Sequence, residues 1–252
     1  MKFYDFPDAY DLIYTDQYYE DCKKFYKDTI GKKKYKDVLD CSIGTGQMAL
    51  PLAMMGYNVT GTDINQNMLS KARSNFAQHK LPVTLSHCDF RKLSSKYKEQ
   101  FDCVLCTGNS LGHVKNDDLE SVITSMHEAL RPGGMIFIDS KNWDKIVKRK
   151  QIFYLNNPII RDRGRVNYVQ FWDHKKDGSI IFFHLIFEEI DNKIVSKRQF
   201  YEVYYPFKSI GVIECLKSLN YQNINICKLG DTSQKDLEKI EWYAITAEKP
   251  IE

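Results

Sequence analysis

A short glycine-containing loop constrains the fold of this chain more than any other feature. Residues 38–49 read Val-Leu-Asp-Cys-Ser-Ile-Gly-Thr-Gly-Gln-Met-Ala. Gly44 and Gly46 allow the backbone to turn sharply and to approach a ligand closely before a helix begins. Asp63 ends the next apolar segment, where a carboxylate can accept hydrogen bonds from ribose hydroxyls. This order of features predicts a nucleotide-binding α/β unit.

Short apolar segments and amphipathic segments alternate around this loop. We expect strands over residues 37–41, 58–62, 83–87, 101–107 and 135–139, and helices over 46–55, 66–76 and 119–130. Gly56 should end the first helix, Asn65 should cap the second, and Asp117 or Asp118 should begin the third. The alternation predicts a mostly parallel sheet with helices on both faces.

The pattern changes after Trp143. Residues 165–172, 179–188 and 193–205 are long, β-branched and aromatic segments joined by Asp177-Gly178 and Asp191-Asn192, which are hairpin signals. They predict a three-stranded antiparallel meander, followed by a helix over 209–219 and strands over 223–229 and 242–248. We therefore expect an N-terminal helical segment that closes the pocket (1–35), a Rossmann-like doubly wound core (36–143), an antiparallel lid (144–206) and a C-terminal completion of the core sheet (207–252).

Composition and charge exclude several other classes of protein. The chain has 43% hydrophobic and 27% charged residues, as is common for cytosolic globular proteins, and its formal net charge of +3 is too small to demand a polyanionic partner. Its longest apolar run, residues 180–187, is too short to cross a bilayer. Seven cysteines without framework spacing indicate reduced thiols. We expect a soluble cytoplasmic protein without membrane or nucleic-acid partners; self-association stays open.

One cysteine pair has the spacing of a metal or redox motif. Cys103 and Cys106 lie within a predicted strand, where an offset of three residues directs the two sulfurs to opposite faces of the sheet. A single ion could not bind both, and no second pair of this kind exists to complete a zinc site. We expect no metal site.

Three acidic residues at consecutive strand ends indicate the charge of the ligand. The glycines alone also match the fingerprint of dinucleotide-binding proteins. Asp40, however, would repel a pyrophosphate by several kcal/mol in a poorly solvated site and would attract an ammonium or a sulfonium. Asp89 follows the third strand and suits an adenine amino group, with Phe90 flanking the ring. Each acid alone could be a helix cap, but together with Asp63 they disfavour an NAD-dependent oxidoreductase.

With these residues the chain resembles the class I S-adenosylmethionine-dependent methyltransferases. Residues 40–46 match their first motif, with Ser42 in place of the first glycine, Asp63 matches the second and Asp89 the third. The resemblance implies S-adenosylmethionine as cofactor, S-adenosylhomocysteine as product, and an in-line displacement at the sulfonium. The expected cofactor-binding residues are Asp40, Ser42, Gly44, Gly46, Asp63, Ile64, Met68, Asp89, Phe90 and Thr107.

Four further segments resemble the glycine and glycine–sarcosine N-methyltransferase branch of that class. They are residues 108–113, 130–139, 142–144 and 204–206, and the resemblance spans roughly residues 10–225. It implies a seven-stranded sheet with an antiparallel lid and a small amine or amino acid as methyl acceptor. The implied catalytic residues are Asn109, His113 and Tyr204, and the implied acceptor-binding residues are Tyr10 (with Tyr14 as an alternative), Asn109, Ser110, Lys141, Tyr204 and Tyr205.

One departure from this branch concerns the acceptor. Lys141 occupies the position of an arginine that clamps the acceptor carboxylate, which keeps the charge but loses the bidentate fork. Arg161, Arg163 and Arg165 could supply a replacement or could be surface charge. His113 could be a base or a packed structural histidine. The alternatives to N-methylation are methylation of another metabolite oxygen or nitrogen or of RNA, and a non-catalytic S-adenosylmethionine-binding protein.

Overall fold

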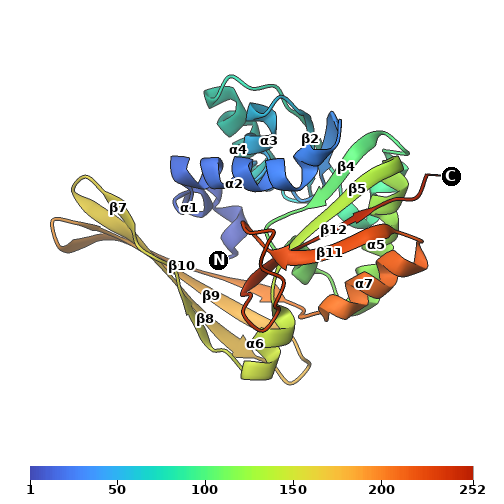
Figure 1. Cartoon of the computed structure of the whole chain (residues 1–252). Coiled ribbons are helices and arrows are strands. Elements are labelled where there is room, and N and C mark those ends of the chain that lie inside the picture. The colour runs from blue at the N-terminus through green and yellow to red at the C-terminus, as the bar shows by residue number, and fades with distance from the viewer. Residues whose placement is uncertain (252) are drawn as a thin grey trace.

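The computed structural model describes residues 1–251 and contains the expected seven-stranded sheet (Figure 1). Its strands are β1 (Asp37–Asp40), β2 (Asn58–Asp63), β3 (Thr84–His87), β4 (Phe101–Cys106), β5 (Leu130–Lys141), β11 (Gln222–Lys228) and β12 (Trp242–Glu248). They follow the order β11-β12-β5-β4-β1-β2-β3, in which β12 is antiparallel to both of its neighbours and the other pairs are parallel. The doubly wound, mostly parallel sheet is thus confirmed.

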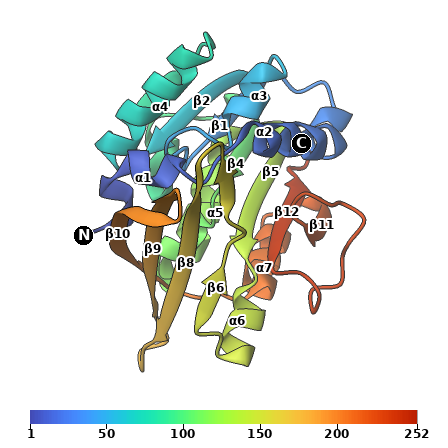
Figure 2. The same ribbon diagram turned by 90° about the vertical axis from the view of Figure 1, so that its left-hand side faces the viewer.

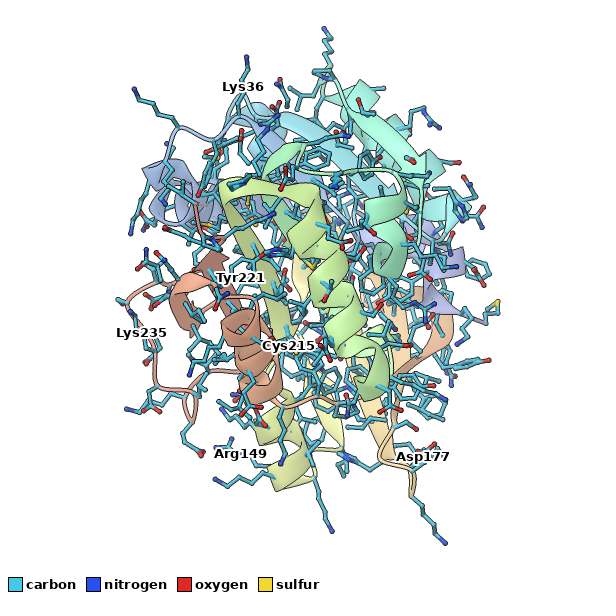
Figure 3. All side chains as sticks on the ribbon, turned by 90° about the vertical axis from the view of Figure 1, so that its right-hand side faces the viewer. Lys36, Arg149, Asp177, Cys215, Tyr221 and Lys235 are labelled. Atoms are coloured by element: carbon cyan, nitrogen blue, oxygen red, sulfur yellow. The ribbon has the colours of Figure 1, made fainter. Side chains whose placement is uncertain are left out.

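Helices cover both faces of this sheet because its central strands are apolar on both sides. Adjacent residues Val38 and Leu39 are both fully buried, and they pack into separate hydrophobic cores. The core of Val38 includes residues of α2 (Asp16–Asp28), α3 (Leu50–Met54) and α4 (Gln66–Gln78), and that of Leu39 includes residues of α5 (Leu119–Ala129) and α7 (Ser209–Ser218). Figure 3 shows α5 and α7 over one face, and places Lys36, just before β1, at the opposite end of the molecule from Asp177. Cys103 and Cys106 likewise belong to the two different cores, as the strand pattern predicted.

A second, antiparallel sheet extends from the core and contains the predicted meander (Figures 1 and 2). Its strands are β6 (Phe153–Leu155), β7 (Ile159–Arg161), β8 (Gly164–His174), β9 (Ile180–Ile190) and β10 (Lys193–Tyr204). The three long strands are confirmed, but the sheet has five strands instead of three because β6 and β7 both pair with β8. Helix α6 (Trp143–Arg149), which the sequence analysis missed, is capped by the side chain of Asn142, which accepts a hydrogen bond from the Lys145 amide at 3.1 Å.

The N-terminal segment connects the two sheets. It contains η1 (Phe3–Asp5), α1 (Pro7–Asp11), α2 and η2 (Ile30–Lys32). The Phe3 amide donates to Glu202 on β10 at 2.7 Å, and the carbonyl of Tyr4 accepts from Asn65 at the start of α4 at 3.1 Å. These contacts place η1 between the carboxyl end of the parallel strands and the inner face of the second sheet.

Several local details differ from the expected boundaries. The helix expected over 46–55 begins at Leu50, because Gly46 has a left-handed φ of +84° and residues 44–49 form turns. Strand β5 begins at Leu130 and not at residue 135. Asp118 occupies the N-cap position of α5, but its carboxylate binds Arg91 instead of the helix amides. The left-handed Gly56 and the Asn65 cap are as expected.

The parallel strands are followed by three short 3-10 helices that shape the site. They are η3 (Phe90–Ser95) after β3, η4 (Ser110–His113) after β4, and η5 (Asn116–Asp118) before α5. Within residues 1–251, no helix combines the length and the apolar character that crossing a bilayer requires.

Candidate functional site

Two cavities adjoin where the carboxyl ends of the parallel strands face the second sheet. Each has a volume of about 270 Å³. The first lies against the loops after β1, β2 and β4, and the second extends toward β6, β8, β9 and β12. Both are lined by Tyr4, Tyr10, Tyr14, Met48 and Gly108. Two compartments with a common wall can hold two reactants next to each other.

The glycine loop forms one wall of the first cavity, and its two left-handed turns favour glycine. Gly44 and Gly46 have φ values of +55° and +84°. A Cβ atom on Gly46 would lie 2.7 Å from a ring carbon of Phe76 on α4, which is closer than van der Waals contact allows. The loop therefore packs tightly against α4 and leaves the backbone beside Gly44 accessible to a ligand.

Asp63, at the end of β2, lines the first cavity and also braces the loop. Its two carboxylate oxygens accept hydrogen bonds from the amides of Gly44 (2.9 Å) and Asn65 (2.8 Å). Burial raises the pKa of this carboxyl group. A carboxylate retains further lone pairs after two such bonds, so it can still accept hydroxyl groups from a ligand.

Asp40 lies behind the first cavity and does not line it, contrary to the expectation of a direct contact. It is fully buried, and its carboxylate accepts hydrogen bonds from the Ser42 amide (3.1 Å) and the Thr107 hydroxyl (2.8 Å). Burial, reinforced by the charges of Asp139 and Asp63, raises its pKa to about 7. Asp40 thus positions two residues that do line the cavity and, in its ionised form, adds a negative charge from behind them.

Asp89 also lies outside the lining of the first cavity. Its carboxylate binds the guanidinium of Arg91 at 2.6 Å and caps η3 through the Arg91 amide, and this pairing lowers its pKa. The adjacent Phe90 does line the cavity. The structure therefore brings the aromatic partner of the expected adenine contact to the site, and it directs the acid toward Arg91.

Of the expected cofactor-binding residues, seven line the first cavity. They are Ser42, Gly44, Asp63, Ile64, Met68, Phe90 and Thr107. Gly46 acts through the turn that it permits. Eight further lining residues were not predicted as site residues from the sequence: Tyr4, Cys41, Ile43, Thr45, Gln47, Met48, Asn65 and Gly108.

The charge of the first cavity fits a cationic nucleoside. Among the described residues of its lining, Asp63 is the only carboxylate and there is no lysine or arginine. Asp40 and Asp139 are buried nearby and bring further negative potential in their ionised forms. A pyrophosphate would find no cationic partner here, whereas an ammonium or sulfonium would be attracted. Within residues 1–251, no group of three histidine, cysteine or acidic side chains is placed to hold a metal ion.

The loop after β4 has two consecutive left-handed residues, Gly108 (φ +71°) and Asn109 (φ +64°). Their amides donate to the two carboxylate oxygens of Asp139, at 3.0 and 3.1 Å, and the indole of Trp242 donates to the same group at 2.8 Å. A left-handed residue other than glycine is a strained feature that is often found at functional sites. The buried charge of Asp139 thus holds this loop in its unusual conformation.

In this conformation the Asn109 side chain is hydrogen-bonded through its carbonyl oxygen. Its carbonyl oxygen accepts hydrogen bonds from the Ser140 hydroxyl (2.9 Å) and the Lys141 amide (3.0 Å). Among residues 1–251 its amide nitrogen has no partner within hydrogen-bond distance, although Asn109 is 2% exposed, interacts with the Tyr204 side chain and lines the second cavity. The two N–H groups are therefore buried in the wall of the second cavity without an acceptor at full hydrogen-bond distance.

His113, Tyr4 and Tyr204 form a hydrogen-bonded group at the junction of the cavities. The Tyr4 hydroxyl lies 3.0 Å from His113 Nε2 and 2.9 Å from the Tyr204 hydroxyl. Since His113 Nδ1 faces the Val203 carbonyl at 3.3 Å, Nδ1 carries the proton and Nε2 accepts one from Tyr4. Burial lowers the pKa of His113 to about 4, so the imidazole is neutral at pH 7.

The other expected acceptor-site residues are distributed unevenly. Tyr10 and its hydrogen-bonded partner Tyr14 line both cavities, and Ser110 lines the first. Tyr204 is buried and lines the second cavity, whereas Tyr205 lines neither because neighbouring residues at the end of a strand face opposite ways.

Lys141 lies in the second cavity within a cage of aromatic rings. Its Nζ atom is 4.5 Å from the ring centre of Tyr154, 4.6 Å from that of Trp242 and 5.4 Å from that of Trp172. Among residues 1–251, no carboxylate forms a salt bridge with it, and burial lowers its pKa to about 8, against a smaller opposing effect of Glu241.

The three arginines considered as a replacement clamp lie on the surface, away from both cavities. Arg163 and Arg165 pair with Asp191 and Glu189, and Arg161 contacts the carbonyl of Leu12 at 3.5 Å. The cation in the second cavity is thus Lys141.

Several other residues of the second cavity were not predicted from the sequence. Tyr168, Gln170, Phe182 and His184 belong to the inward positions of β8 and β9. A period-two alternation was visible in both strands, and polar side chains at its buried positions were the available signal.

Comparisons with known proteins agree with this geometry. Residues 38–134 match the family model described as a methyltransferase domain. The chain is 29% identical over 136 residues to a glycine/sarcosine N-methyltransferase of Aphanothece halophytica, which covers 52% of this chain and 51% of that protein. It is 25% identical over 218 residues to the enzyme of the same name from Parasynechococcus marenigrum, and this match covers 85% of this chain and 72% of that protein.

A solved structure shows the same fold over nearly the whole chain. It is an S-adenosylmethionine-dependent methyltransferase of Clostridium acetobutylicum, with a TM-score of 0.76, 20% sequence identity and coverage of 98% of both chains. The match to the Aphanothece protein spans about half the length of that relative.

Proposed function

Because this chain carries a class I S-adenosylmethionine-dependent methyltransferase domain, we propose that it transfers the methyl group to a nitrogen of a small-molecule amine or amino acid. The observation that carries this proposal is the pair of adjoining cavities that share a wall of tyrosines. The first is lined by the carboxylate of Asp63, and the second by the amide of Asn109 and the ammonium of Lys141.

The first cavity would hold the cofactor, which supplies a methyl group on a positively charged sulfur. Asp63 is placed to accept ribose hydroxyls, and Phe90 and Met68 offer apolar surface to the base. The loop from Ser42 to Gly44, with Asp40 behind it, is placed beside the cationic amino acid part.

The second cavity would orient the acceptor nitrogen toward that methyl group. Methyl transfer by displacement needs alignment, exclusion of water and a free lone pair on the acceptor. Tyr10 and Tyr14 lie on the common wall, where aromatic faces stabilise a nearby cation by roughly 0.5–2 kcal/mol. Asn109 supplies the fixed donor that orients the acceptor.

His113 is better suited to positioning than to proton abstraction. A general base works best with a pKa near the operating pH, and burial holds that of His113 at about 4. Its Nε2 instead accepts the proton of Tyr4, which fixes the Tyr4 hydroxyl beside that of Tyr204. On this view the acceptor arrives as the neutral amine, and His113 keeps the two tyrosines in place.

The proposal is tested first by ligand binding. S-adenosylhomocysteine should raise the melting temperature, since a ligand at a hundred times its Kd stabilises a protein by about 2.7 kcal/mol. NADH is the control, and stabilisation by NADH alone would refute the assignment. Transfer of a labelled methyl group should then be measured on glycine, sarcosine, other amines and matched alcohols. Binding without transfer to any of them would indicate a sensor, and transfer to alcohols alone would indicate an O-methyltransferase.

A further inference from the structure

Two unpaired hydrogen-bond donors belong to the wall of the second cavity. Asn109 Nδ2 and His184 Nε2 are buried nitrogen atoms without a partner at hydrogen-bond distance among residues 1–251, and both residues are 2% exposed. Asn109 comes from the loop after β4 and His184 from β9, so they reach the cavity from two different sheets. Buried polar groups are almost always satisfied, and two exceptions in one cavity wall point to a ligand that completes them.

A chain of hydrogen bonds fixes His184 as a donor. The Trp172 indole donates to Gln170 Oε1 at 3.1 Å, which leaves the Gln170 amide nitrogen to donate to the Tyr168 hydroxyl at 2.7 Å. Among residues 1–251 the Tyr168 hydroxyl has no other acceptor for its own proton, so we assign that proton to the hydrogen bond with His184 Nδ1, at 2.6 Å. Because Nδ1 accepts, the neutral ring carries its proton on Nε2, and this is the atom without a partner.

Lys141 adds a positive charge to the same wall. Its Nζ lies among the rings of Tyr154, Trp172 and Trp242, and its charge is one of the causes that lower the pKa of His184, to about 3. Burial is the largest of these causes. Among the described residues that line the second cavity there is no aspartate or glutamate. The wall therefore offers donors and a cation without a balancing anion.

The size of the second cavity exceeds that of the smallest amino acid. A volume of about 270 Å³ corresponds to roughly nine water molecules at about 30 Å³ each. Glycine, with its handful of non-hydrogen atoms, would leave much of this space to water beside the aromatic rings of Phe182 and Tyr168. A longer molecule would fill the space between the tyrosine wall and Lys141.

We propose that Asn109, Lys141 and His184 form a subsite for a carboxylate or similar oxyanion of the methyl acceptor, and that this acceptor is an amine longer than glycine. The inference deepens the proposed function and rests on it. Tyr168 and Gln170 are positioning residues, because they act through the ring of His184.

The experiment compares acids with their amides. The protein saturated with S-adenosylhomocysteine is titrated calorimetrically with three pairs: glycine and glycinamide, 4-aminobutyrate and its amide, and 3-aminobenzoate and its amide. We expect at least one of the two longer acids to bind at least tenfold more tightly than its amide, which is about 1.4 kcal/mol, and more tightly than glycine. If no acid is preferred over its amide, the oxyanion subsite is refuted. If glycine binds best, the inferred length is wrong.

Substitutions at His184 and Tyr168 test the donor directly. His184→Phe should weaken binding of the preferred acid at least tenfold and change binding of its amide by less than twofold. Tyr168→Phe, which frees Nδ1 to take the proton, should reduce the same acid-to-amide ratio. His79→Phe, at an exposed histidine on the far end of α4, is the matched control and should change neither. Equal losses for acid and amide in both cavity variants would refute the role of His184.

These results separate the two proposals. If S-adenosylhomocysteine does not bind, the proposed function itself fails. If it binds and methyl groups are transferred to amines without any preference for acids, only the subsite fails.

Discussion

Replacing Asp40 by asparagine probes the charge beneath the glycine loop. The carboxylate is fully buried and accepts hydrogen bonds from Ser42 and Thr107, and burial raises its pKa to about 7. Asparagine has nearly the same shape, can accept from the Ser42 amide and does not titrate. The variant therefore removes the charge and preserves most of the packing.

The magnitude follows from proton linkage. An aspartate has a pKa of about 3.9 in an unfolded chain, so the folded protein binds the Asp40 proton more tightly. The stability contributed by the protonated carboxyl is fully present below pH 4 and is lost as the pH rises through about 7. At about 1.4 kcal/mol per pH unit, the loss between pH 5 and pH 8 is about 3 kcal/mol.

The assay is urea unfolding of the protein and of Asp40→Asn at pH 5 and at pH 8. The free energy of unfolding of the variant, relative to that of the natural chain, should rise by about 3 kcal/mol between the two pH values. Asp139, whose pKa burial raises to about 6, titrates in both proteins, and an unfavourable contact of the new amide with Thr107 is present at both pH values. Both largely cancel in the comparison. A difference independent of pH would show that Asp40 is not held protonated by its surroundings.

Three further substitutions test the site. Asp63→Ala should weaken S-adenosylhomocysteine binding at least tenfold, measured by calorimetry, because Gly44 and Asn65 lose their common acceptor; an unchanged Kd would remove Asp63 from the site. Asn109→Gly, which keeps the left-handed backbone, should lower kcat/KM for the acceptor at least tenfold and leave the cofactor-product Kd within twofold, and the reverse pattern would contradict the assignment of this loop. In the natural enzyme we expect the KM for carboxylate acceptors to rise above pH 8, where the Lys141 ammonium loses its proton. Lys141→Arg should remove this rise, because arginine stays charged. A KM of the natural enzyme that stays flat from pH 7 to pH 9 would contradict this role.

The core fold was predictable because it depends on local periodicity. Strands such as β4 are apolar apart from one residue, Asp102; helices such as α4 begin at a recognisable cap, and left-handed glycines such as Gly56 mark helix ends. Strands β6 and β7 have three residues each, too few to show a period, and they exist because β8 offers them an edge. Their positions could be found only after β8 was placed.

The candidate site was predictable where one loop supplies it and not where distant segments meet. Ser42, Gly44 and Asp63 follow from the strand–loop–helix pattern. The role of Asp40 depends on Thr107, which is 67 residues away, and that of Asp89 on the competing guanidinium of Arg91. Tyr4 is held at the site by contacts with distant segments, since Glu202 on β10 binds the adjacent Phe3 amide and Asn65 binds the Tyr4 carbonyl.

The two cavities differ in the charged and polar groups of their walls. Beside the first cavity, Asp63 accepts hydrogen bonds from two amides, although the Thr45 hydroxyl has no partner at hydrogen-bond distance among the described residues; behind the common wall, Asp139 accepts from two amides and an indole. In the wall of the second cavity, Asn109 and His184 each retain a buried donor without a partner at that distance among residues 1–251, which costs a protein about 1–3 kcal/mol per group. Fully bonded carboxylates form a rigid negative wall before any ligand arrives, whereas unpaired donors gain their bonds only from a ligand. With the cavities assigned as proposed, the first is preorganised for the cofactor, and we expect the selectivity of the second to come from bonds that only the correct acceptor completes.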